Sequence, residues 1–175
     1  MILVASVLVL AGCLAQWENP YFVVKPSGLN WVIIRQHYMT GPMAGYHVKV
    51  SIHGNGTVEV SEGTSALVSN SFAYNTKSDT WGDNHKARTT ISEEETNMIF
   101  QDLVNNGLFV KRERSIFSEE SAPIENAFIY VSANIQNKTT GSPDPVTDPD
   151  LLDSLKMTIA WFYQPRPASK KPTLN

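Results

Sequence analysis

The fold is decided by residues 31–60, WVIIRQHYMTGPMAGYHVKVSIHGNGTVEV. Residues 31–38, 46–53 and 57–60 are rich in β-branched and aromatic side chains, and the segments between them contain Gly-Pro, Ala-Gly and Asn-Gly. This pattern predicts three consecutive antiparallel strands, with a long first loop and a tight turn at Asn-Gly, where both turn residues take positive φ. The folded part of the chain therefore starts as a β-meander.

The register of the first two strands follows from placing Tyr38 opposite Tyr46. Side chains alternate between the two faces of a strand, so one face is expected to point to the core and the other to be solvated. On the second face, His37 is opposite His47 and Arg35 is opposite Lys49. The expected core-facing residues are Val32, Ile34, Gln36, Tyr38, Tyr46, Val48, Val50 and Ile52.

Two helices are expected after the meander. Ser92 and Glu95 match a capping box, and Gly107 suits the left-handed position that ends a helix. Asp148 followed by Pro149 is typical of the start of a second helix. The apolar side chains that share one face are Ile99, Phe100, Leu103 and Val104 in the first helix, and Leu151, Leu152, Leu155, Ile159 and Phe162 in the second.

The remaining stretches complete the domain prediction. Residues 127–135 alternate as a central strand does, whereas residues 62–90 are polar and predict a loop with one weak strand. We therefore expect an α+β domain over residues 30–163, in which an antiparallel sheet of four to five strands packs against two helices. Residues 16–29 are expected to be a tether and residues 164–175 a disordered tail.

Residues 1–15 have the character of an export leader. Residues 2–15 are uncharged and almost wholly apolar, yet shorter than the roughly 20 residues that span a bilayer. They include Leu10-Ala11-Gly12-Cys13, which resembles the lipobox of prokaryotic lipoproteins and implies lipid attachment at Cys13. The expected location is extracytoplasmic, with the lipid bilayer as a partner through the acylated N-terminus. Cleavage after Ala15 is the alternative and would give a secreted protein.

Charge and cysteine content exclude other classes of protein. Fourteen basic and seventeen acidic side chains give a net charge of -3, which leaves no broad electrostatic footprint for nucleic acid. The single cysteine provides no disulfide, so a hydrophobic core must stabilise the domain. Asn55 and Asn137 each begin a glycosylation sequon in a predicted turn.

Five groups of residues occur in this order: Gly41 to Gly45, Ile91-Ser92-Glu93-Glu94, Gly107-Leu108-Phe109, Ala127-Phe128-Ile129-Tyr130-Val131, and Pro149 with Leu152 and Leu155. This order resembles emfourin, the family of small proteins that inhibit thermolysin-like metalloproteases such as protealysin. The resemblance implies a binding loop made of Gly41, Pro42, Met43, Ala44, Gly45 and Tyr46, and a secreted metalloprotease as the partner.

No catalytic signature accompanies these motifs. The sequence lacks a Gly-x-Ser-x-Gly elbow and a phosphate-binding glycine loop, and helix capping accounts for the acidic run at residues 93–95. We therefore expect no enzyme activity and no cofactor. Two alternatives remain open: a metal site on His37 and His47 with a third ligand from His53, His85 or Asp83, or a structural or adhesive envelope protein.

Overall fold

A computed structural model of the chain describes residues 21–38, 46–64, 82–110, 127–141 and 145–163. These residues form an α+β fold, as the sequence predicts. In chain order the elements are β1 (Trp31–Tyr38), β2 (Tyr46–His53), β3 (Thr57–Thr64), β4 (Gly82–Thr90), α1 (Glu93–Asn105), β5 (Ala127–Ile135), β6 (Lys138–Gly141) and α2 (Pro149–Phe162).

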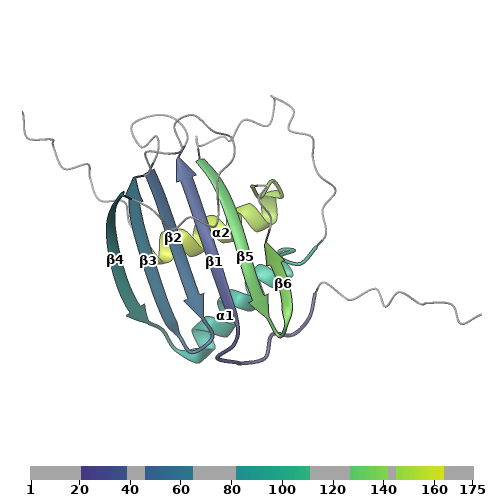
Figure 1. The fold of residues 1–175 in the computed structure, drawn as a ribbon. Coiled ribbons are helices and arrows are strands. Elements are labelled where there is room, and N and C mark those ends of the chain that lie inside the picture. The colour runs from purple at the N-terminus through teal and green to yellow at the C-terminus, as the bar shows by residue number, and fades with distance from the viewer. Residues whose placement is uncertain (1–20, 39–45, 65–81, 111–126, 142–144, 164–175) are drawn as a thin grey trace, which may run out of the picture.

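The sheet has six strands in the order β4-β3-β2-β1-β5-β6, and every neighbouring pair is antiparallel. The predicted meander is confirmed, as is its register, since His37 is opposite His47 and Ile34 is opposite Val50. The long strand at residues 127–135 pairs with β1 on its other side, so β1 lies inside the sheet. Both helices lie on one face of the sheet, and no helix of the described residues covers the other face (Figure 1).

The sheet has six strands where four to five were expected, and its two edge strands are those with the weakest sequence signal. β4 lies in the polar connector, and its side chains from His85 to Thr90 are all exposed, so it has no alternating apolar pattern to reveal it. It is an edge strand whose backbone pairs with β3, with one exposed cross-strand ion pair, Arg88 to Glu59, at 3.9 Å. β6 has only four residues and is the opposite edge.

The turns differ from the expected pattern. The hydrogen bond that closes the β2–β3 turn runs from the Gly56 amide to the His53 carbonyl at 2.9 Å, and only Gly56 has a positive φ, of 82°. The connection is therefore a loop with one left-handed glycine. The prediction of a two-residue Asn-Gly turn with two positive φ values is wrong. Two positive φ values occur instead at Gln136 and Asn137, 52° and 64°, which form the tight turn between β5 and β6.

The core lies between the sheet and the two helices. Phe100 and Leu103 of α1 and Leu155 of α2 are fully buried against the helix-facing side of the sheet. Burying one such side chain contributes about 1.5–3 kcal/mol. The sheet residues of this core are Val32, Ile34, Val48, Val50, Ile52, Val58, Val60, Ile129, Ala133 and Ile135.

Both predicted helix starts are confirmed. The Glu95 amide donates to Ser92 Oγ at 3.1 Å, and the Ser92 amide donates back to the Glu95 carboxylate at 2.8 Å. The Ser92 hydroxyl also donates to this carboxylate at 2.8 Å, and the hydrogen bond from the Ser92 amide, followed by the one from the hydroxyl, lowers the pKa of Glu95. In α2, the Leu151 amide donates to Asp148 Oδ1 at 3.0 Å, and Gly107 after α1 has a φ of 89°.

Residues 21–29 belong to the packed domain, which corrects the prediction of a tether for this part of the chain. The Val24 amide donates to Gln101 Oε1 at 2.8 Å, and Gln101 Nε2 donates to the Phe22 carbonyl at 2.9 Å. Val24 is buried, and the Phe22 ring lies 5.7 Å from the Phe109 ring. One side chain of α1 therefore holds the extended N-terminal segment against the helix layer.

Several sequence predictions fall outside the described residues. These are the leader with Cys13, the loop residues 41–45 and the expected tail at 164–175. Within the described part of the chain, neither helix combines the length and the apolar character that a membrane-spanning helix requires.

The turn at Gly56 provides a stability test. A Cβ atom at this position would lie 2.2 Å from the Ile91 carbonyl oxygen, and the backbone is left-handed. Gly56→Ala should therefore lower the free energy of unfolding by about 2–3 kcal/mol, measured by urea denaturation. Gly28→Ala is the matched control, because a Cβ there meets nothing within 4 Å. Equal stability of the two variants would contradict this description of the turn.

Candidate functional site

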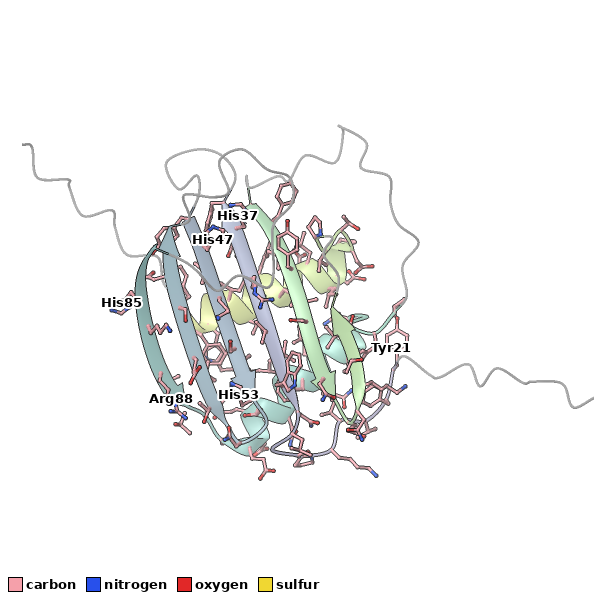
Figure 2. The ribbon with its side chains drawn as sticks, viewed as in Figure 1. Tyr21, His37, His47, His53, His85 and Arg88 are labelled. Carbon is pink, nitrogen blue, oxygen red and sulfur yellow. The ribbon has the colours of Figure 1, made fainter. Side chains whose placement is uncertain are left out.

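The candidate site is the end of the β1–β2 hairpin. Residues 39–45 connect these two strands, and the described residues at the ends of the connection are Tyr38 and Tyr46. Both tyrosines are partly buried and pack against the core. His37 and His47 lie next to them in sequence and at this end of the sheet (Figure 2). The loop therefore emerges from a part of the molecule that is well packed.

The first cluster at this end is a stacked histidine pair on the face without helices. The rings of His37 and His47 are 4.2 Å apart between centroids and only 10° from parallel. Only 2% of His37 and 1% of His47 is exposed. The expected solvated face is therefore wrong at this point, since the imidazoles are as buried as core residues. In the sheet, Phe128 of β5 lies beside His37, and Gly63 of β3 lies beside His47.

Burial determines the charge of this pair. Desolvation lowers the pKa of His37 from 6.5 to about 4, and desolvation together with the nearby His37 lowers the pKa of His47 to about 4. Both rings are therefore neutral at pH 7. Arg35 and Lys49 occupy the next cross-strand pair on the same face. Their positive charges would repel a proton added to either histidine.

The stacked geometry does not match that of two ligands to one metal. An imidazole lone pair lies in the plane of its ring, and planes 10° from parallel do not meet near the nitrogens. His53 is at the far end of β2, six residues from His47, and His85 is opposite Glu62 on the helix-facing side. Among the residues described, no group of three or more metal-ligating side chains occurs. The metal alternative remains a prediction that requires one ring to rotate and a third ligand to approach.

The second cluster lies on the helix-facing side of the same hairpin end. It joins Tyr46 of β2, Glu62 of β3 and Tyr163, the residue that caps α2. Burial, followed by side-chain hydrogen bonds with Tyr46 and Glu62, raises the pKa of Tyr163. Glu62 is only 8% exposed, and its Oε1 lies 3.8 Å from His85 Nδ1. This network connects the last residue of the predicted loop to the C-terminal end of α2.

Together the two clusters fix both ends of the connection. The histidine pair joins β1 to β2 on one face, and the tyrosine–glutamate network joins β2 to β3 and α2 on the other. Of the predicted loop, Gly41, Pro42, Met43, Ala44 and Gly45 lie outside the described residues, and Tyr46 is partly buried. The arrangement can therefore hold a loop in position, which is what a binding loop requires.

Sequence reasoning missed the part of the site contributed by Glu62 and Tyr163. One signal was present: Val58, Val60 and Glu62 alternate on β3, so the carboxylate occupies a core-facing position. A charged residue at such a position needs hydrogen-bond partners. No signal in the sequence placed Tyr163 beside it, because that contact depends on how α2 crosses the sheet.

No protein-family model matches this chain, and no curated protein matches it. The interpretation of the site therefore depends on its geometry and on the motifs in the sequence.

The buried histidines predict a specific pH dependence of stability. The folded-state pKa values, about 4, lie below the unfolded value of 6.5, so the unfolded state binds more protons between these limits. Stability should be fully present above pH 6.5 and fall toward pH 4, by about 3 kcal/mol per histidine. In the variant His37→Phe/His47→Phe the decrease should be smaller by the contribution of both histidines. The free energy of unfolding is measured by urea denaturation at each pH.

His53→Phe is the control for this experiment, because His53 lies on the same strand but outside the stacked pair. It should keep the decrease seen in the wild type. Parallel stability curves for the wild type and the double variant would contradict the assignment of the pH dependence to the pair.

Proposed function

We propose that this chain is an exported, lipid-anchored and non-catalytic binding domain that inhibits a thermolysin-like metalloprotease through residues 41–46. The observation that carries the proposal is the construction of the loop base. Two buried side-chain clusters, one on each face of the sheet, hold the strands from which the loop emerges.

The physical argument concerns the entropy of binding. An inhibitory loop must enter a cleft and keep its shape there, and each rotamer-rich side chain that is immobilised on binding costs about 0.5–1.5 kcal/mol. A loop whose ends are already fixed loses less freedom when it binds. Pro42 restricts the backbone further, and Met43 and Tyr46 provide apolar surface for the partner.

The direction of the loop also supports the proposal. Residues 21–30 approach the sheet at the end where β1 begins, whereas the loop leaves from the end where β1 terminates (Figure 1). The described N-terminal segment and the loop are therefore at opposite ends of β1. An anchor joined to residue 21 would not have to pass the loop to reach the domain.

The inhibitor proposal predicts a loop-dependent effect on proteolysis. Purified protein at micromolar concentration should slow a thermolysin-like protease acting on a peptide substrate. Met43→Asp should raise the inhibition constant about 30-fold, because loss of a central apolar contact costs about 2 kcal/mol. Met98→Asp is the matched control: Met98 is 55% exposed on α1, and the same substitution there should leave the inhibition constant unchanged.

Absence of inhibition by the wild-type protein at this concentration would contradict the proposal. Equal losses in Met43→Asp and Met98→Asp would show that the effect does not come from the loop.

Lipid attachment has a separate test. Mass spectrometry of the mature protein from a lipoprotein-processing bacterial host should find Cys13 as the first residue, with its mass increased by acyl chains. Cys13→Ser should abolish this modification and release the protein from the membrane fraction. A mature N-terminus at Gln16 would instead identify a secreted protein and contradict the anchor.

A further inference from the structure

The outer surface of the helix layer has a groove that the proposed function does not use. It lies between the C-terminal part of α1 and the N-terminal half of α2, with a volume of about 440 Å³. Its lining residues are Asp102, Asn106, Asp150, Asp153, Ser154 and Met157. Three of these carry carboxylates and none is cationic, and Ser154 Oγ donates a hydrogen bond to Asp102 across the two helices.

An exposed apolar stripe continues from this groove along α2. Asp153, Met157 and Trp161 are four residues apart, so they share one face of the helix. Met157 is 73% exposed and Trp161 is 63% exposed. The stripe runs from the acidic groove toward Tyr163, which is the last described residue of the chain. An acidic end and an apolar track together suit a segment that carries both cations and apolar side chains.

The sequence that follows Tyr163 has this composition. Residues 164–175 read QPRPASKKPTLN, with Arg166, Lys170 and Lys171 as cations, three prolines and no acidic residue. Both helices have the opposite charge to this segment, since α1 and α2 together carry six acidic side chains and one basic side chain, Lys156. Charge complementarity therefore favours contact between this segment and the helix layer.

The distances agree with this pairing. An α-helix rises about 1.5 Å per residue, which places Asp153 and Asp150 about 15 and 20 Å back along α2 from Tyr163. A proline-rich extended segment advances about 3.1 Å per residue, which gives Lys170 and Lys171 a reach of about 22–25 Å. A segment that turned back along α2 would thus bring Pro165 and Pro167 over Trp161 and Met157, and its lysines over the groove.

We propose that the groove between α1 and α2, with the Met157–Trp161 stripe, is a docking surface for residues 164–175 of the same chain. Because the segment is tethered, its effective concentration at the groove reaches the millimolar range, which is sufficient for a weak contact to be populated. Docking would remove exposed methionine and tryptophan surface from water and would neutralise the acidic groove. The proposal is independent of the inhibitor function, because no residue that lines the groove belongs to the loop or to the two clusters at its base.

Paramagnetic NMR on the full chain tests this inference. A nitroxide label is placed at Ser169→Cys in a Cys13→Ser background, which removes the only other cysteine. The Asp150 and Asn106 amide resonances should lose at least two-thirds of their intensity at low salt. They should recover in 1 M salt, where the screening length is about 3 Å.

Charge exchange makes the test specific. Lys170→Glu/Lys171→Glu should restore the intensities at least twofold, and addition of Asp150→Lys/Asp153→Lys to that variant should broaden the groove resonances again, read at Asn106. Glu94→Lys on α1 makes the same kind of charge change outside the groove, on an exposed residue, and should have no effect. Broadening that is indifferent to the lysine substitutions would overturn the proposal. Broadening that appears only between labelled and unlabelled molecules in a mixed sample would also overturn it, in favour of a second copy of the chain.

Discussion

The structure depends on the position of β1 inside the sheet. β1 pairs with β2 on one side and β5 on the other, and its Val32 and Ile34 side chains are fully buried against the helices. A strand held in this way has no freedom to shift its register, because a shift by one residue would exchange its buried and outer faces. The meander, the stacked histidines and the place where the loop leaves the sheet all follow from this register.

Much of the fold was accessible from local signals. Each signal lies within a few residues: the alternation in β1, β2 and β5, and the helix caps at Ser92 and Asp148. The α+β class and both helices could therefore be predicted. The position of β4 within residues 62–90 and the presence of β6 could not be predicted, because both strands are stabilised by backbone pairing with a neighbour and carry no apolar pattern. Residues 21–29 were missed for a related reason: their place depends on Gln101, about 80 positions away.

The site was only half predictable. The facing pair of His37 and His47 followed from the register, but its burial did not, since period-two alternation assigns that face to solvent. The network of Tyr46, Glu62 and Tyr163 needs three elements that meet only in the folded chain. Both clusters carry polar groups in buried positions at one end of one hairpin.

Hydrogen exchange of the protein mixed with a thermolysin-like protease tests the central claim most directly. The claim is that a loop fixed at its base enters the catalytic cleft. Exchange at the amides of Tyr38, Tyr46 and His47 should slow at least tenfold in the mixture, and a small zinc-chelating inhibitor that fills the cleft should abolish the change. Unchanged exchange at these amides, or slowing that persists when the cleft is filled, would contradict the account.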